Sequence, residues 1–484
     1  MTDTIINAIT IALVLGQIVA SIWGRRIGIC YYFVVCGISY FSFWMFGTWT
    51  LDRLCGSVYI VAELFRSRFR PGMIRGHIPF WLLSLYGIVS TLLFMIVWPT
   101  GWVSSRSAVY SQLRGVIQIA NWIVMMGMAW HISKALTVDK TWRTLRKWTA
   151  VASLVFCCYA FYQVIAYSFQ LPMTGIRRPV LDGFIVDDKE DENAAFEYAG
   201  QMFYRPGSLI GEPKVLGGMC VLWSVIAVAG YFGGPAEVLR LPSLIVSLAA
   251  LMLTSSTSAI GGALLALCVL VAFSLLRKHA SMRSRVFLAT GVAMLAIFVF
   301  IALNPVAAGT LEGILRVRTV NRLANGGALG DKAEMLSMEV LKAHPEFAVT
   351  GVGLGGMSFY IAEMAGGTNL ILSPNNGLLA WICDVGLLGF GAVVVMALRA
   401  LRGVGGQSEA RQRAFAFIGL SMLLQCFVFS QPFLMSMALG FLGAAYEIHR
   451  TGRRAQRRVH VTGRDPVVGR LAQPGAVVVN SRGV

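Results

Sequence analysis

The stretch that decides the fold is Arg205-Pro-Gly-Ser-Leu-Ile-Gly-Glu-Pro-Lys-Val-Leu-Gly217, which leads directly into an apolar run from Gly218 to Phe232. It places an arginine, a glutamate and a lysine at the entrance to a hydrophobic segment. Charge is costly at membrane depth and is kept where it faces a cavity or performs a task. Its glycines and prolines predict a bent backbone, which a bilayer tolerates only where protein or water satisfies the polar groups. The stretch therefore predicts either a functional entrance to a buried helix or an interfacial turn whose charges mark a helix end.

The composition is that of a membrane protein. Of 484 residues, 56% are hydrophobic and only 13% are charged, against about 25% charged in soluble domains. The net charge is +18, but the basic residues lie between apolar runs and in the tail. This placement indicates that they orient the protein in the membrane and do not bind nucleic acid. The nine cysteines have no metal-binding or C-x-x-C spacing and are expected to be core residues without a disulfide framework.

We predict an all-α, polytopic membrane helical bundle of 12 or 13 transmembrane helices, because each span needs about 20 apolar residues. The segment from Leu54 to Phe65 is either the thirteenth span or an interfacial helix. Residues 5–23 lack a basic leader and a cleavage site, so we expect a retained helix. The predicted spans are 5–23, 29–48, 79–98, 109–130, 149–169, 208–231, 241–256, 258–276, 286–303, 376–398, 412–429 and 431–448.

Basic residues orient the bundle. Five clusters, at 66–75, 134–147, 277–285, 399–413 and 450–458, fall on one side of the predicted spans. The positive-inside rule makes that side the cytoplasm. Thirteen spans would add Arg25 and Arg26 to the same side and place the N-terminus outside, which we favour. The acidic run 187–192 is then external and is expected to be a solvated face.

The sequence divides into five regions. The long outer segment is expected to be structured, because connections of about 70 residues are rare. Within it, Asp331 and Glu334 form a capping box, Leu336, Val340 and Leu341 form an apolar stripe, and Pro345 ends the predicted helix. The regions are N-terminal helices with an acidic outer loop (1–203), central helices (204–303), a large extracytoplasmic loop (304–374), C-terminal helices (375–448) and a basic tail expected to be disordered (449–484).

Several charged residues are predicted to share the outer face. Arg205, Glu212 and Lys214 precede the central helix; the outer loop supplies Arg316, Arg318, Arg322 and His344. Guanidinium groups bind phosphate oxygens through paired hydrogen bonds, so Arg205 with Arg316 or Arg318 is predicted to hold a pyrophosphate. The alternatives are headgroup contacts by a solvated loop for the arginines and a helix C-cap for His344.

The outer loop and the helix after it carry further candidates. Gly351-x-Gly353-x-x-Gly356 matches a dinucleotide fingerprint, but no βαβ unit accompanies it. We expect instead a turn at Gly353 that lets the backbone approach a sugar or a phosphate. Asn375 and Asn376 are expected either to cap the next helix or to bind substrate. Asp384 lies two turns deeper and needs a partner there.

Three blocks of this sequence resemble the O-antigen polymerase/ligase superfamily of membrane glycosyltransferases. The first is Arg205-x-Gly207 with Glu212-Pro213. The second is Leu253-Thr-Ser-Ser-Thr-Ser-Ala-Ile-Gly-Gly262, in which the family's usual Ser-Arg step reads Ser-Thr. The third runs from His344-Pro345 and Gly351-x-Gly353 to Asn375-Asn376-Gly377 and Asp384-x-Gly386. The blocks cover roughly residues 200–400.

The resemblance implies a polymerase in the bacterial inner membrane with its active site facing the periplasm. Its substrate would be an undecaprenyl-pyrophosphate-linked oligosaccharide, with no metal and no cofactor. Its partners would be membrane lipids, a flippase and chain-length or export proteins. Ligases of the family carry a histidine where Asn375 or Asn376 stands, so its absence here favours a polymerase. A ligase and a transporter remain the alternatives.

Overall fold

The structure is a computed structural model. It describes residues 3–38, 42–44, 48–67, 78–97, 103–104, 109–169, 171, 195–198, 201–232, 237–254, 256–275, 332–364, 374, 376–402, 404, 410–429 and 431–462.

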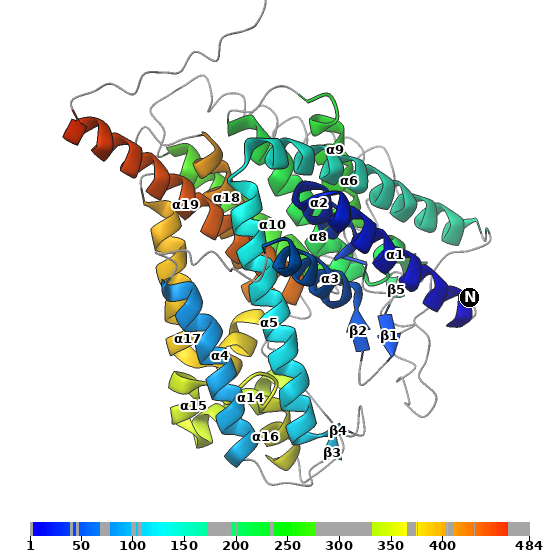
Figure 1. The fold of residues 1–484 in the computed structure, drawn as a ribbon. Coiled ribbons are helices and arrows are strands. Elements are labelled where there is room, and N and C mark those ends of the chain that lie inside the picture. Colours follow the sequence, from blue (N-terminus) through cyan, green and yellow to red (C-terminus); the bar gives the residue numbers. More distant parts are fainter. Residues whose placement is uncertain are drawn as a thin grey trace, which may run out of the picture.

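The described residues are mainly helical (Figure 1). Three two-stranded antiparallel hairpins interrupt them: β1 (Ser42–Trp44) with β2 (Thr48–Thr50), β3 (Val103–Ser104) with β4 (Val109–Tyr110), and β5 (Ala195–Tyr198) with β6 (Gln201–Tyr204). The helices are α1 (Asp3–Trp23), α2 (Arg25–Val35), α3 (Leu51–Arg66), α4 (Ile78–Val97), α5 (Ser111–Leu136), α6 (Asp139–Ser168), α8 (Pro213–Ala229), α9 (Arg240–Leu253), α10 (Thr257–Leu275), α14 (Lys332–Ala343), α15 (Pro345–Thr350), α16 (Met357–Met364), α17 (Gly377–Leu401), α18 (Ala410–Val428) and α19 (Pro432–Thr462), with 3-10 turns at Ser208–Ile210 and Gly230–Phe232.

Several helices have the length and composition of membrane spans. Within the described residues five qualify: Ile78–Val97, Leu113–Leu136, Asp139–Ser168, Pro213–Phe232 and Gly377–Leu401. Much of α4 faces outward through large apolar side chains such as Trp81, Leu85 and Leu93. A helix in water would carry a polar outer face, so the apolar exposed face indicates lipid. The predicted helical membrane bundle is confirmed at this level.

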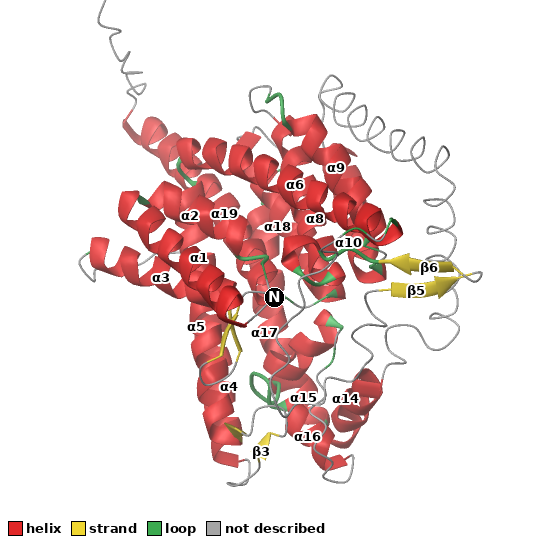
Figure 2. Cartoon of the chain, turned by 90° about the vertical axis from the view of Figure 1, so that its right-hand side faces the viewer, coloured by secondary structure: helices red, strands yellow, loops and turns green. Residues whose placement is uncertain are grey.

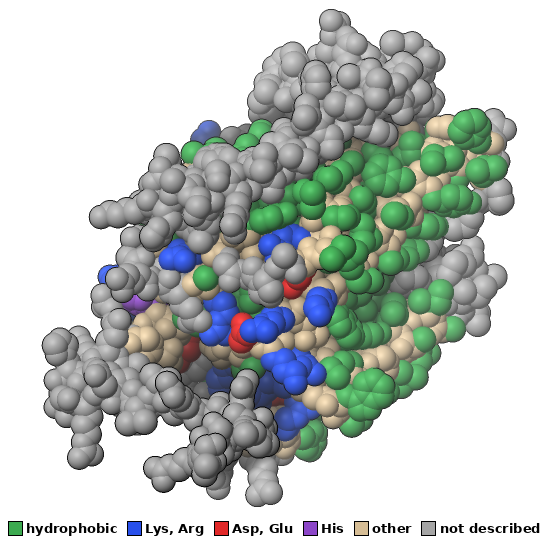
Figure 3. All heavy atoms as spheres, turned by 90° about the horizontal axis from the view of Figure 1, so that it is seen from above, with side chains coloured by type: hydrophobic (Ala, Val, Ile, Leu, Met, Phe, Trp, Pro, Cys, Tyr) green, Lys and Arg blue, Asp and Glu red, His purple; other side chains and the backbone are tan. Residues whose placement is uncertain are grey.

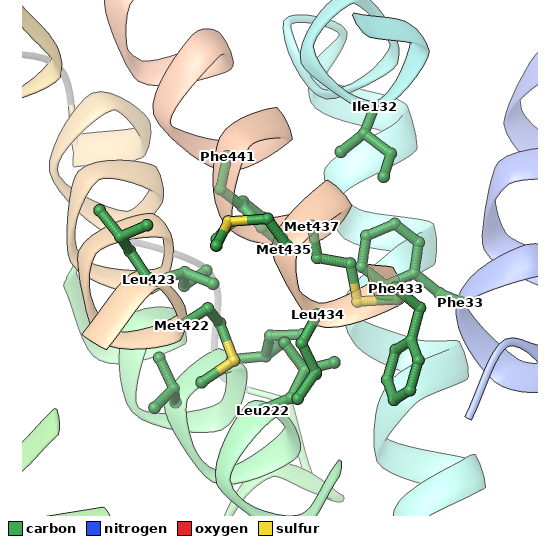
Figure 4. Packing of buried hydrophobic residues seen from close by; sticks show 14 of the residues in the cluster. Phe33, Ile132, Leu222, Met422, Leu423, Phe433, Leu434, Met435, Met437 and Phe441 are labelled. Atoms are coloured by element: carbon green, nitrogen blue, oxygen red, sulfur yellow. The ribbon is translucent and has the colours of Figure 1, made fainter. Parts of the chain in front are cut away.

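The centre of the bundle is α8. Of the apolar window in Pro213–Phe232, 94% is buried, against 39% in α17. Figure 4 shows Leu222 of α8 beside Met422 of α18 and Leu434 of α19, in a cluster that also includes Phe33 of α2 and Ile132 of α5. The Gly218–Phe232 run is apolar on every side because helices surround it on every side.

Charged side chains gather at one end of the bundle, named here the basic end. Arg25 Nε lies 2.6 Å from Glu63 Oε2, and Arg66 pairs with the same carboxylate. Arg411 Nη1 donates to Thr137 O at 3.0 Å, which joins the start of α18 to the turn between α5 and α6. Seen from above, this end displays lysine and arginine side chains beside a smaller number of acidic ones (Figure 3). Arg25, Arg66 and the 134–147 cluster therefore meet at one end, as the favoured orientation requires.

A second group of helices lies at the opposite end. α14, α15 and α16 pack with α4 and α17 around a smaller apolar cluster that contains Phe94, Val340, Phe359 and Cys383 (Figures 1 and 2). Val340 is fully buried there, and Leu336 and Leu341 pack against the cluster. The predicted amphipathic helix is confirmed as α14, and it ends before Pro345 as expected.

Four sequence predictions need correction. The span predicted at 29–48 ends at Val35, where the chain passes close to α8: a Cβ on Gly37 would lie 2.8 Å from Met219 Cε. The basic loop at 134–147 is mostly helix, because α6 begins at Asp139. The tail expected to be disordered continues α19 as far as Thr462. The helix predicted at 376–398 is present as α17 but is broken at Gly386 (φ 62°, ψ −177°). The predicted span 286–303 lies outside the described residues.

Candidate functional site

The turn from Arg205 to Glu212 is sharply bent, as its glycines and prolines predicted. Ser208 has a φ of 54° and Gly211 a φ of 94° around a short 3-10 turn. A Cβ on Gly207 would lie 2.5 Å from Gly211 O, so only glycine fits this crossing. Gly211 N donates to Gly207 O at 2.8 Å.

The helix α6 supplies the polar partners of this turn. Ser208 N donates to Gln163 Oε1 at 2.7 Å, and Ser208 Oγ donates to Phe156 O at 2.6 Å. Both acceptors lie in the apolar second half of α6. A bent backbone is tolerated here because protein groups satisfy it.

Arg205 is buried against the junction of α9 and α10. Its side chain is only 8% exposed, and Nε donates to Thr254 O at 3.1 Å. A Cβ on Gly217 would lie 3.2 Å from Thr254 Oγ1 and 3.4 Å from Ser256 Cβ. The 205–217 stretch and the 253–262 stretch, about 40 residues apart in sequence, therefore form one structure.

Glu212 and Lys214 stand at the start of α8, a few residues after Arg205 in the chain. Glu212 is the N-cap residue, Pro213 occupies the first helical position, and Glu212 O accepts from Leu216 N at 2.9 Å. Both charged residues are half-buried, and Lys214 Nζ lies 4.0 Å from the centre of the Phe429 ring. Two cations and one carboxylate thus lie at or just before the start of the central helix, with Arg205 on Thr254 and Lys214 on Phe429. We name Arg205, Glu212 and Lys214 the entrance cluster.

The glycine-rich run packs into the break of α17. Val352 N donates to Cys383 O at 2.7 Å and Gly353 N to Asp384 O at 3.1 Å. Gly351 (φ 71°, ψ 165°) and Gly386 both occupy a backbone region that is essentially restricted to glycine. A Cβ on Gly351 would lie 2.6 Å from Asp384 O, and a Cβ on Gly386 would lie 2.5 Å from Gly351 N. Only glycine allows these two segments to cross.

Gly353 also contacts α4. A Cβ there would lie 2.9 Å from Ser90 O and from Thr91 Cα, and the next residue, Leu354, donates its N–H to Thr91 Oγ1 at 3.0 Å. The N–H groups of this turn are hydrogen-bonded to protein. Close packing against α4 therefore explains why a glycine stands at position 353. The expected approach of the backbone to a sugar or a phosphate is not needed to explain it.

Asp384, which lies within the apolar span of α17, has the hydrogen-bond partner that was expected for a carboxylate there. Its Oδ1 accepts from Gly355 N at 2.9 Å, and Arg114 of α5 is near enough to interact with it electrostatically. Arg114 also lies 5.6 Å from the Phe359 ring centre, and Gln118 of the same helix lies against Gly355. We name Asp384, Arg114, Gln118 and the Gly355 N–H the break cluster.

The other predicted residues at this end have structural partners. Asn376 caps α17: Oδ1 accepts from Leu379 N at 3.0 Å, and Asn376 N donates to Glu334 Oε1 at 3.1 Å. His344 lies between α14 and α15, is exposed, stacks on Phe347 at 4.9 Å, and has Nδ1 3.3 Å from Glu346 Oε1. The capping alternative is confirmed for Asn376. His344 directly follows the last residue of α14, and its N–H donates to Val340 O at 2.8 Å, as the C-cap alternative expected.

The structure thus places Arg205, Glu212 and Lys214 on the segment that enters α8, and separately places His344, Gly353 and Asn376 at the end that carries Asp384. Arg316, Arg318, Arg322 and Asn375 lie outside the described residues, so the arginine pairing stays a prediction.

Arg114, Gln118 and Gln163 were missed by sequence reasoning. Each is a polar residue inside an apolar span, and this alone would have been a signal.

Comparison with protein-family models and with curated proteins found no match to this chain.

Proposed function

We propose that this protein is a membrane glycosyltransferase that polymerises lipid-pyrophosphate-linked oligosaccharide units. The product would be a bacterial exopolysaccharide, capsule or O-antigen made at the outer face of the inner membrane. The observation that carries the proposal is the entrance cluster: a buried arginine, a carboxylate and a lysine at the start of α8, the most buried of the five apolar spans found in the described residues. The order of the three sequence blocks that resemble O-antigen polymerases supports it.

The chemistry asks for positive charge at the leaving group. A sugar hydroxyl of one unit attacks the anomeric carbon of another, the carbon–oxygen bond to pyrophosphate breaks, and the lipid pyrophosphate leaves with the electron pair. A preorganised guanidinium stabilises that developing charge, and losing one such donor costs about 100-fold or more in rate. We assign this role to Arg205, together with Arg316 or Arg318, with Lys214 and Arg322 binding the phosphates.

The reaction also needs a base, and a carboxylate on the same turn as Arg205 can serve as one. The attacking hydroxyl must lose a proton, for which Glu212 and His344 are the candidates. Glu212 is on the same turn of the chain as Arg205, whereas His344 lies between α14 and α15, which pack around the separate apolar cluster of Phe94, Val340 and Cys383. We therefore assign the base to Glu212.

The topology belongs to the same proposal. With the basic end in the cytoplasm, the entrance cluster and the large loop at 304–374 would lie on the extracytoplasmic side. A flippase and chain-length or export proteins would then act before and after this protein.

The test is transfer by the purified full chain in detergent micelles, with a radiolabelled undecaprenyl-pyrophosphate oligosaccharide as the only donor. We expect a ladder of products that contain two or more repeat units. Only single units after prolonged incubation, at protein concentrations above that of the donor, would contradict the proposal.

A transporter is the second candidate, and the break in α17 is the observation that favours it. Discontinuous helices at membrane depth commonly form substrate sites in transporters, and here the break holds an aspartate near an arginine. Movement of the labelled donor across liposomes without any new glycosidic bond would support this function instead.

A further inference from the structure

The last helix, α19, leaves the bundle before it ends. From 433 to 445 every residue is buried, and a Cβ on Gly440 would lie 2.6 Å from Ile132 Cγ2. Further along the same helix, Gly452 is exposed, and a Cβ on it would meet no described atom within 4 Å. The chain nevertheless continues as helix beyond this point and runs out past its neighbours at the upper left of Figure 1. We name residues 449–462 the α19 extension.

The α19 extension begins at the basic end of the bundle. Glu447, just before it, lies near enough to Lys134 of α5 to interact with it electrostatically. Arg450 Nη2 lies 3.6 Å from Glu447 Oε1. The positive-inside rule assigns the basic end to the cytoplasm. The α19 extension therefore starts where the helix reaches the cytoplasmic surface of the membrane.

Five arginines occupy one side of the α19 extension. At about 3.6 residues per turn, their positions fall within an arc of about 140° around the helix axis. The opposite arc holds Gly452, Ala455 and Val459, whose apolar surface is too small for insertion into the acyl layer. The α19 extension can therefore present charge to a surface without entering it. We name the five positions the basic face: Arg450, Arg453, Arg454, Arg457 and Arg458.

The chain supplies almost no negative charge to balance the basic face. After Glu447 the next acidic residue is Asp465, which is also the last one in the sequence. Within the basic face, three pairs of arginines stand four residues apart and two pairs stand three residues apart. Like charges at these spacings oppose helix formation, although arginines near a helix C-terminus gain from the macrodipole. A short segment of helix is marginal in water, so an anionic surface would stabilise the α19 extension.

We propose that the basic face binds anionic lipid headgroups of the adjacent leaflet. Arg458, the farthest of the five arginines, is ten residues past Ile448, a distance of about 15 Å along a helix axis. Electrostatic attraction extends over about 8 to 10 Å at physiological ionic strength, so a helix that leaves at an angle keeps most of the basic face within reach of the headgroups. Clusters of about four to eight basic residues directly beyond a membrane helix are typical of such binding. An acidic protein would offer the same charge, but the lipid is already present at this position.

Hydrogen exchange of the purified full chain tests the proposal. Backbone amides of residues 451–462 are followed in nanodiscs of phosphatidylcholine and in nanodiscs that also contain phosphatidylglycerol. We expect exchange at least about tenfold slower with phosphatidylglycerol, because binding to the surface suppresses local opening of the helix. Salt at about 0.5 M should reduce this difference to about twofold or less, since it shortens the screening length. The buried segment 433–445 should exchange equally in both nanodiscs.

A triple variant removes most of the basic face. Arg454→Gln/Arg457→Gln/Arg458→Gln should exchange within about twofold in the two nanodiscs. In phosphatidylcholine alone it should exchange no faster than wild type, because the changes also remove every pair of arginines four residues apart. None of the three arginines belongs to the entrance cluster, so this result is independent of the proposed glycosyl transfer.

The matched control removes three arginines that follow the α19 extension and leaves the basic face intact. It should keep the difference of about tenfold seen with wild type. Equal exchange of the wild-type protein in the two nanodiscs would overturn the proposal and leave the basic face to an acidic protein. Equal losses in the two triple variants would also overturn it, because the attraction would then not depend on the basic face. The control variant is Arg464→Gln/Arg470→Gln/Arg482→Gln.

Discussion

The helices α8 and α17 bring polar groups into the apolar bundle in two different ways. α8 is regular within its bounds, and its charged residues, Glu212 and Lys214, stand at its start with Arg205 just before them. α17 begins with an ordinary N-cap and then breaks at Gly386, next to Asp384. In α8 the charge lies at the end of an intact helix. In α17 it lies inside a span, at a point where the helix is interrupted.

The two sites differ in which neighbouring groups satisfy their polar backbone. The entrance turn before α8 is held by side-chain and backbone groups of α6 and by the carbonyl of Thr254. The break in α17 is held by the backbone of a separate segment, whose N–H groups at 352 and 353 bond the carbonyls of Cys383 and Asp384. A break within a span therefore depends on two distant glycines, and substitutions there should affect folding more than activity.

The largest effect on stability is expected from Gly386→Ala. Its backbone region is essentially restricted to glycine, and a Cβ there would contact Val349 O and Gly351 N. We expect the free energy of unfolding to fall by about 3 kcal/mol, measured by denaturant unfolding in mixed micelles. Gly391→Ala on the same helix is the control, because its Cβ would meet nothing within 4 Å; it should be neutral or stabilise by up to about 1 kcal/mol. Equal losses in both variants would refute this account of the break.

A smaller loss is expected from Asp384→Ala. This change leaves the Gly355 N–H without its acceptor, so the free energy of unfolding should fall by about 2 kcal/mol. Asp384→Asn keeps an oxygen at the same position and should lose less.

The Arg114→Gln background tests the electrostatic part of that effect. Residues in contact give non-additive changes, so Asp384→Asn should cost less in this background than in the wild type. Strict additivity of the two changes would show that Arg114 and Asp384 do not interact.

The smallest effect is expected from Asn376→Ala. Loss of the side-chain cap that accepts from Leu379 N should lower the free energy of unfolding by about 1 kcal/mol. Asn376→Ser can still cap the helix and should restore most of the loss. If serine does not restore stability, capping is not the contribution of this residue.

The sequence predicted these regions unequally. The bend at 205–212 followed from its glycines and prolines, and α14 followed from Glu334, the apolar stripe and Pro345. The break in α17 could not be predicted, because Gly386 stands in an apolar run like any tolerated glycine and its conformation is set by contact with Gly351, 35 residues earlier in the chain.

The buried position of Arg146, which is 4% exposed with Nη2 3.0 Å from Glu237 Oε1, was missed for a related reason. A run of lysines and arginines from 134 to 147 is typical of a cytoplasmic loop, and only the start of α6 at Asp139 turns one of its members into the bundle. Arg205 could be identified because its charge stands directly before a long apolar run, although its partner Thr254 lies 49 residues later. Arg146 owes its environment to α8 and α9, more than 70 residues away.

The most direct test of the central claim is the rate of glycosyl transfer by Arg205→Ala, measured with the purified protein and a lipid-pyrophosphate-linked oligosaccharide in micelles. Arg143→Ala, which removes an exposed charge from the basic end, is the control and should behave as wild type. We predict that Arg205→Ala reaches the membrane, loses about 1 to 3 kcal/mol of stability with its bond to Thr254, and, per folded molecule, transfers about 100-fold more slowly or worse. A full ladder of polymer at the wild-type rate from Arg205→Ala would contradict the claim that this arginine stabilises the departing pyrophosphate.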